Sequence, residues 1–159
     1  MSGRGRPAVE VEEVAPDNPD AAACLARYFG ELANRFESGF DASLSSAPDL
    51  SGFEPPGGCF LVIRNNGQPI ACGGFKRDDG AAYIKRMWVA DEARGMGLGR
   101  RLLAELEKRA RSRGYKLIRL ETERSLTEAQ ALYRSSGYVE VPAFNDELYA
   151  HHWFEKRLD

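Results

Sequence analysis

One stretch of the chain decides how the rest is interpreted: Met87-Trp88-Val89-Ala90-Asp91-Glu92-Ala93-Arg94-Gly95-Met96-Gly97-Leu98-Gly99-Arg100-Arg101. It joins an apolar, strand-like start to a glycine-rich turn and then to a segment with apolar residues at helical spacing. The first N–H groups of a helix have no partner inside the helix, and the helix dipole adds positive potential there. Glycines let phosphate oxygens approach these amides, so we expect a pyrophosphate site to which Arg94, Arg100 and Arg101 contribute charge.

Two other glycine motifs do not fit this stretch. A P-loop ends in G-K-S/T, whereas Arg100 and Arg101 follow the last glycine here. A dinucleotide fingerprint spaces its glycines as G-x-G-x-x-G, and this chain has G-x-G-x-G. An NTPase and a nicotinamide-dependent dehydrogenase are therefore not supported, although glycines alone are also compatible with a plain strand-to-helix turn.

The segments before this loop predict a strand, a helix and a meander. Alternating valines predict a strand over 8–14, and Asp17 or Asn18 can cap a helix over 19–36. A loop rich in Ser, Pro and Gly follows over 37–58. Three strands are then expected, over 59–64, 69–75 and 81–89, with tight turns at Asn66-Gly67 and at Asp79-Gly80.

The segments after the loop predict two more helices and three more strands. The first helix ends at Gly114, and a strand follows over 116–122. Ser125 or Thr127 is expected to begin the second helix with a capping box, and Gly137 to end it. Two final strands are expected over 138–141 and 151–157. The predicted class is α/β (α+β), a mixed, mostly antiparallel central sheet of about seven strands flanked by helices on both faces.

Length and composition limit the remaining possibilities. With 159 residues, the chain has room for one domain over 8–159, preceded by a flexible N-terminal tail over 1–7. The formal net charge is −2, so no nucleic-acid partner is indicated, and no apolar run could span a membrane. Three cysteines without a C-x-x-C pair indicate neither disulfides nor a metal site, which favours a cytoplasmic protein.

Two motifs together resemble those of the GNAT superfamily of acyl-CoA N-acyltransferases. The pyrophosphate loop of that superfamily reads Q/R-x-x-G-x-G/A, and residues 94–99 match it completely. Residues 129–138 are similar to its A-x-x-L-Y-x-x-x-G-F/Y segment. The predicted order of elements also resembles that fold from residue 8 to the end of the chain.

The resemblance implies acetyl-CoA as the cofactor, with its pyrophosphate on the amides from Arg94 to Arg100 and its pantetheine arm beside the strand before them. The residues implied to bind it are Met87, Trp88, Val89, Arg94, Gly95, Met96, Gly97, Leu98, Gly99 and Arg100. Where many members of the superfamily have an Asn that helps to hold the pantetheine, this chain has Leu126, and Thr127 is a candidate replacement.

Acetyl transfer to an amine needs a proton donor for the departing thiolate and a group that takes the proton of the amine. The resemblance gives the first role to Tyr133, and it implies that the N–H of Trp88 or Val89 polarises the thioester carbonyl. The strand over 81–87 has no carboxylate to act as the base. Glu121, Asp146 and a water chain to His152 are the alternatives.

The resemblance places the acceptor pocket among the first helix, the loop after it, the central strands and the last hairpin. These segments offer Tyr28, Phe36, Phe40, Arg86, Asn145, Tyr149 and His152. Arg86 can pair with a substrate carboxylate, which indicates an amine that resembles an amino acid.

We therefore expect direct acetyl transfer from acetyl-CoA to the primary amine of a small molecule. A protein or peptide acceptor is one alternative, and a non-catalytic acyl-CoA sensor is another. The resemblance also allows a homodimer joined through the late strands.

Overall fold

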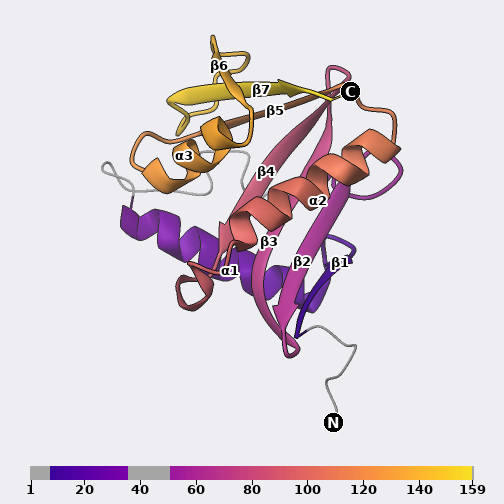
Figure 1. Ribbon diagram of the computed structural model, residues 1–159, viewed down its shortest axis with the longest axis vertical. Helices are drawn as coiled ribbons and strands as arrows, with labels where there is room; N and C mark the ends of the chain where they lie inside the picture. The colour runs from indigo at the N-terminus through magenta and orange to yellow at the C-terminus, as the bar shows by residue number, and fades with distance from the viewer. Residues whose placement is uncertain (1–7, 36–50, 159) are drawn as a thin grey trace.

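The computed structural model of the protein describes residues 8–35 and 51–158 (Figure 1). The elements are, in chain order, β1 (Val9–Glu13), α1 (Pro19–Arg35), β2 (Cys59–Asn65), β3 (Gln68–Asp78), β4 (Ala81–Val89), the short helix η2 (Asp91–Ala93), α2 (Leu98–Ser112), β5 (Leu117–Thr122), α3 (Thr127–Ser135), β6 (Val139–Val141) and β7 (His152–Arg157). The predicted class is confirmed, because seven strands form one mixed sheet with helices on both faces. The expected tail over 1–7, Phe36 and Phe40 lie outside the described residues.

Local sequence chemistry explains the two tight hairpins and the start of α1. Asn66 and Gly67 have φ angles of 52° and 83°, so both central residues of the β2–β3 turn are left-handed. Asp79 and Gly80 repeat this pattern between β3 and β4, with φ angles of 49° and 81°. At the start of α1, the side-chain oxygen of Asn18 accepts the N–H of Asp20 at 2.9 Å, as an N-cap does.

The strands follow the order β1-β2-β3-β4-β5-β7-β6, and every neighbouring pair is antiparallel except β4 and β5. Those two strands pair only at Ala82 with Ile118 and at Tyr83 with Arg119. Past these residues β4 and β5 diverge, which leaves a wedge-shaped opening in the sheet (Figure 1). The backbone groups of β4 beyond Tyr83 are therefore not paired with β5.

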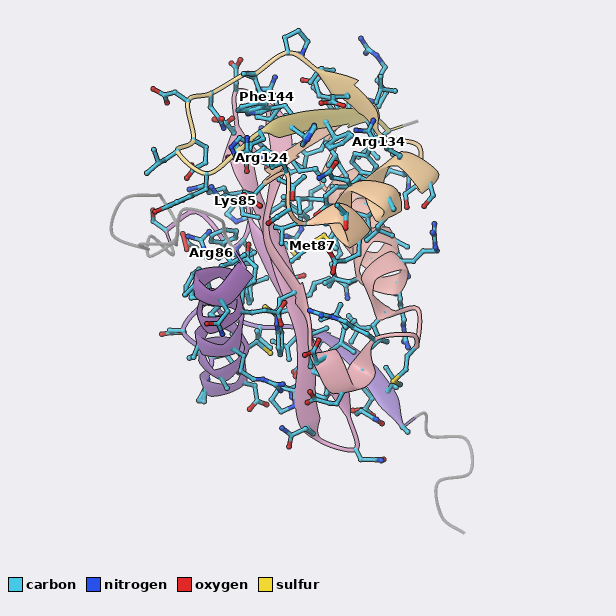
Figure 2. All side chains as sticks on the ribbon, turned by 90° about the vertical axis from the view of Figure 1, so that its left-hand side faces the viewer. Lys85, Arg86, Met87, Arg124, Arg134 and Phe144 are labelled. Carbon is cyan, nitrogen blue, oxygen red and sulfur yellow. The ribbon has the colours of Figure 1, made fainter. Side chains whose placement is uncertain are left out.

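The two faces of the sheet carry different helices. In Figure 2 the sheet is seen near its edge, with α1 on one side and α2 and α3 on the other. Leu102, Leu103 and Leu106 of α2 are fully buried against the sheet, and Cys24 and Leu25 of α1 are buried from the other side. Burying such side chains stabilises the fold by roughly 1.5–3 kcal/mol each. All three cysteines are free and buried.

A β-bulge interrupts β4 beside the opening. Cys72 pairs with Trp88, and Gly74 pairs with Lys85. The paired residues are two positions apart on β3 and three positions apart on β4, so β4 has one extra residue. Arg86, inside the bulge, has a φ of +62°, which is uncommon for a side-chain-bearing residue. The bulge re-aims the side chains that follow Ile84, and these residues border the functional site.

Candidate active site

The glycine-rich turn ends β4 and leads through η2 into α2. Gly97 is the N-cap of α2 with a φ of +75°, and Gly95 has a φ of +89°. The first helical bond runs from the N–H of Arg101 to the carbonyl of Gly97 at 3.1 Å. The N–H groups of residues 98–100 therefore precede the helical ladder and can meet an anion. A Cβ built on Gly95 or Gly97 would meet no atom within 4 Å, so the space above the turn is open.

A groove of about 520 Å³ begins at this turn and runs between α1 and α3. Of the ten residues expected to bind the cofactor, nine line it: Met87, Trp88, Val89, Arg94, Gly95, Gly97, Leu98, Gly99 and Arg100. Met96 does not line the groove, and 48% of its surface is exposed. The turn directs the side chain of Met96 to solvent while the backbone on both sides of it borders the groove.

The two arginines of the groove have different partners. Arg94 pairs with Glu31 of α1 at 2.6 Å and also with Asp91, so carboxylates offset its charge. Arg100 donates to the hydroxyls of Ser135 at 2.8 Å and Ser136 at 3.2 Å. These partners are neutral, so among the described residues no carboxylate pairs with Arg100, and the two hydroxyls fix its guanidinium against the end of α3. An anionic ligand in the groove would meet Arg100 and the helix N-terminus together.

A second, smaller pocket of about 130 Å³ opens at the splayed ends of β4 and β5. Tyr28 and Arg86, both expected to bind the acceptor, line it together with Glu121. Arg86 is only 4% exposed, and its guanidinium lies 5.0 Å from the ring centre of Phe53. Figure 2 shows Arg86 on the α1 side of the sheet and Met87 on the side of α3. The bulge thus presents a buried cation to the smaller pocket and Met87 to the groove.

Tyr133 of α3 lies where the groove and the pocket meet, because it lines both. It is 7% exposed, and its ring packs against those of Tyr138 at 6.0 Å and Phe154 at 5.8 Å. Burial, and secondly the negative charge of Glu121, raises the pKa of Tyr133 well above its ordinary value. The phenol therefore keeps its proton at neutral pH and can act as a donor.

Glu121 lies at the end of β5 and lines the smaller pocket. Its Oε1 accepts hydrogen bonds from the hydroxyl of Tyr83 and from Nδ2 of Asn145, the latter at 3.0 Å. Of the bases considered from the sequence, Asp146 and His152 line neither cavity. Of these three candidates, only Glu121 borders the smaller pocket.

Comparisons with known proteins agree with this geometry. The profile of the Acetyltransferase (GNAT) family matches residues 26–138. A relative from Azospirillum brasilense, named IAA acetyltransferase, is 36% identical over 122 residues, which cover 76% of this chain and 75% of the relative. The chain belongs to the GNAT family of acetyltransferases.

Solved structures share the GNAT fold over nearly the whole chain. A GNAT family acetyltransferase from Staphylococcus aureus Mu50 superposes with a TM-score of 0.80 at 21% identity, covering 95% of this chain and 99% of that one. YncA from Salmonella typhimurium, solved with its cofactor acetyl-CoA, has a TM-score of 0.66 at 19% identity, covering 96% of this chain and 95% of that one. GNAT acetyltransferases use acetyl-CoA, which fits a groove that begins at a helix N-terminus.

The remaining expected site residues have other surroundings in this GNAT domain. His152 forms a hydrogen bond with Glu140 of the neighbouring strand at 2.7 Å. Asn145 lines neither cavity, and its amide bonds to Glu121, Tyr83 and Trp153. Leu126 lines both cavities as an apolar wall, whereas Thr127 lines neither. The structure brings Tyr28, Arg86, Glu121 and Tyr133 together and leaves His152 outside this group.

Several residues that line the smaller pocket were missed by sequence reasoning. Lys85 and Glu147 form an ion pair at 3.6 Å there, and Glu123 also borders the pocket. Tyr149, which was expected at the acceptor pocket, lines the same cavity. Lys85 lies directly before Arg86 in the sequence. Knowledge of the register between β3 and β4 would have revealed the bulge and identified Lys85 as a pocket residue. Burial lowers the pKa of Lys85 from its ordinary value.

Residues 8–35 and 51–158 lack two other kinds of site. No helix in these segments has the length and apolar character needed to span a membrane. The same residues contain no group of three or more His, Cys, Asp or Glu side chains arranged to hold a metal ion.

Proposed function

We propose that the protein transfers the acetyl group of acetyl-CoA directly to the primary amine of a small molecule that also carries a carboxylate. The observation that carries this proposal is the position of Tyr133, which borders the cofactor groove and the acceptor pocket at once. A group at this junction can reach both the sulfur that leaves and the atom that attacks. The acceptor pocket, about 130 Å³ in volume, suits a small molecule rather than a chain segment.

The groove fits the cofactor on three observations. The space above Gly95 and Gly97 is open, the N–H groups of residues 98–100 precede the helical ladder, and Arg100 is bonded only to neutral hydroxyls among the described residues. These groups would hold the pyrophosphate of acetyl-CoA. Met87, Trp88 and Val89 would flank its pantetheine arm. Bound acetyl-CoA supplies an activated thioester at the opening between β4 and β5.

The residues at the opening divide the proton transfers between them. Glu121 accepts a proton from the amine as the bond from nitrogen to the acetyl carbon forms. Tyr133 donates its hydroxyl proton to the sulfur as the bond from carbon to sulfur breaks. The N–H of Trp88 or Val89 polarises the carbonyl oxygen. Among the described residues, no cysteine lines either cavity. Neither cavity therefore offers a thiol that could carry the acetyl group as a covalent intermediate.

The acidic group of the acceptor is assigned from Arg86. Arg86 is 4% exposed and its guanidinium lies over the ring of Phe53, so the side chain has little freedom, and its planar charge can pair with a carboxylate. Arg86 keeps this position through a left-handed backbone conformation, and strain of this kind is concentrated at functional sites. The relative named IAA acetyltransferase supports a small acceptor for this chain as well.

The test has a binding step and a turnover step. Calorimetric titration with acetyl-CoA comes first, and we expect saturable binding. The protein is then supplied with acetyl-CoA and amines in matched pairs, each an amino acid and the same molecule without its carboxylate, beside peptides of mixed sequence. Release of free CoA and the mass of the acetylated product are measured. The protein's own thiols are buried, which keeps the background of a thiol reagent low.

Three results are informative. Acetylation of amino acids in preference to their decarboxylated partners supports the proposal. Turnover with peptides alone would replace it with a protein acetyltransferase. Binding of acetyl-CoA without turnover on any amine would favour the non-catalytic sensor.

A further inference from the structure

Asn145 lies in the connection between β6 and β7, and its side-chain amide forms hydrogen bonds through both its nitrogen and its oxygen. Nδ2 donates to Oε1 of Glu121 and to the hydroxyl of Tyr83, both at 3.0 Å. Oδ1 accepts Nε1–H of Trp153 at 2.9 Å and the backbone N–H of Glu147 at 3.3 Å. The Tyr83 hydroxyl also donates to the same Glu121 oxygen, so Nδ2 of Asn145, that hydroxyl and Oε1 of Glu121 form one closed triangle of hydrogen bonds. Both polar atoms of the Asn145 side chain therefore have partners within the protein.

Glu121 is fixed by one of its two oxygens. The hydroxyl of Tyr83 and Nδ2 of Asn145 both donate to Oε1. Within residues 8–35 and 51–158, no hydrogen bond ends on Oε2, although Glu121 lines the acceptor pocket. One oxygen is thus anchored, and the other is available to an incoming amine.

Tyr83 stays a donor throughout the usual pH range. Burial, followed by the charge of Glu121, raises the pKa of Tyr83 well above its ordinary value. Its ring is also fixed edge-on to Phe144 at 6.1 Å. A phenol held in this way orients the carboxylate beside it but does not compete with it for a proton.

We propose that Asn145 and Tyr83 are positioning residues that orient Glu121 as the general base, with Oε1 anchored and Oε2 taking the proton of the amine. This inference rests on the proposed function. Because Asn145 comes from the β6–β7 connection, that connection supports catalysis in addition to lining the acceptor pocket through Glu147 and Tyr149. Its attachment is reinforced at Glu147, which pairs with Lys85 of β4 at 3.6 Å.

The first test needs neither cofactor nor acceptor. The side-chain NH₂ group of Asn145 is followed by NMR in the wild type and in Glu121→Ala and Tyr83→Phe. We expect two well-separated proton signals with slowed solvent exchange in the wild type, because Nδ2 donates to Glu121 and Tyr83. Either substitution should move these signals and speed exchange. Signals that neither substitution moves would overturn the proposed arrangement.

The second test uses an amine that the wild type acetylates. Asn145→Ala should lower kcat by about tenfold or more, while KM for the amine changes less than about twofold. In a Glu121→Gln background, the same substitution should cause little further loss, because its effect passes through Glu121. His152→Ala serves as the control, since His152 lines neither cavity, and its kcat should match the wild type.

Two kinetic outcomes would overturn the inference. A raised KM with unchanged kcat would make Asn145 an acceptor ligand. A full loss that persists in the Glu121→Gln background would make it a purely structural residue. If the wild type acetylates no amine, the proposed function fails by itself, and the NMR test still decides whether the arrangement around Glu121 exists.

Discussion

Tyr28 of α1 and Tyr133 of α3 come from opposite faces of the sheet, and each lines both the cofactor groove and the acceptor pocket. They lie close enough for a charge on Tyr133 to add to the pKa of Tyr28, which burial already raises well above its ordinary value. In the proposed mechanism, the two phenols lie at the junction where the acetyl group passes from the cofactor to the amine. Either hydroxyl could protonate the thiolate by position alone, so the two residues need to be separated by experiment.

Tyr133→Phe tests the role of the Tyr133 hydroxyl with little disturbance of the fold. The phenylalanine ring keeps the packing against Tyr138 and Phe154, so we expect stability and acetyl-CoA affinity to change little. Loss of the proton donor should lower kcat by at least about tenfold. Steady-state release of CoA gives the rate, and calorimetry gives the affinity.

Tyr28→Phe is the matched control, since it removes a buried hydroxyl from the same junction. We expect it to alter KM for the amine more than kcat, as suits a residue on the acceptor side. If Tyr28→Phe abolished turnover while Tyr133→Phe preserved it, the role of proton donor would pass to Tyr28.

The pH dependence of kcat follows from the raised pKa of Tyr133. A raised pKa means that the neutral phenol persists to higher pH than usual, so donation is retained as pH increases. An unperturbed tyrosine loses its proton near pH ~10. We therefore expect kcat at saturating substrate to show no descending limb up to about pH 10. A descending limb between about pH 8 and about pH 9.5 that vanishes in Tyr133→Phe would contradict this assignment.

Much of the fold could be predicted because its signals are local. Asn66-Gly67 and Asp79-Gly80 require positive φ angles, and both turns form where the sequence placed them. The strand over Ala81–Val89 has the predicted bounds. The predicted capping boxes do not form, because Ser125 donates its N–H and hydroxyl to the carboxylate of Glu123, and α3 begins at Thr127 with Leu126 as its N-cap.

The acceptor side could be predicted only in part, because it depends on contacts between distant segments. Tyr83 and Glu121 are 38 residues apart, and they meet because β4 and β5 pair in parallel for two residues before they diverge. Asn145 was expected to bind the acceptor, but its side-chain amide is hydrogen-bonded to Glu121 and Trp153. His152 faces Glu140, a partner set by the pairing of β6 with β7. None of these pairings leaves a local pattern in the sequence.

Arg86→Gly tests the carboxylate on the acceptor without straining the backbone. Glycine readily adopts the φ of +62° found at this position, so the bulge should persist. A charge-assisted hydrogen bond contributes about 1.5–3 kcal/mol, so KM for an amino acid should rise by roughly tenfold or more. KM for the decarboxylated amine should change little. An equal rise for both members of the pair would mean that Arg86 supports the pocket and does not bind the carboxylate.

Gly97→Val tests the cofactor site against a control of the same conformation. Gly97 has a φ of +75° in the groove, and Gly67 has a φ of +83° in the β2–β3 hairpin; a Cβ at either would meet no atom within 4 Å. A left-handed conformation costs a side-chain-bearing residue roughly 1–2 kcal/mol, so both variants should lose similar stability in urea unfolding. Only Gly97→Val places methyl groups where phosphate oxygens would lie, so it alone should weaken acetyl-CoA binding by more than about tenfold. Normal acetyl-CoA binding by folded Gly97→Val would show that the pyrophosphate does not bind at this turn. Equal weakening in Gly67→Val would instead trace the loss of binding to reduced stability of the whole domain.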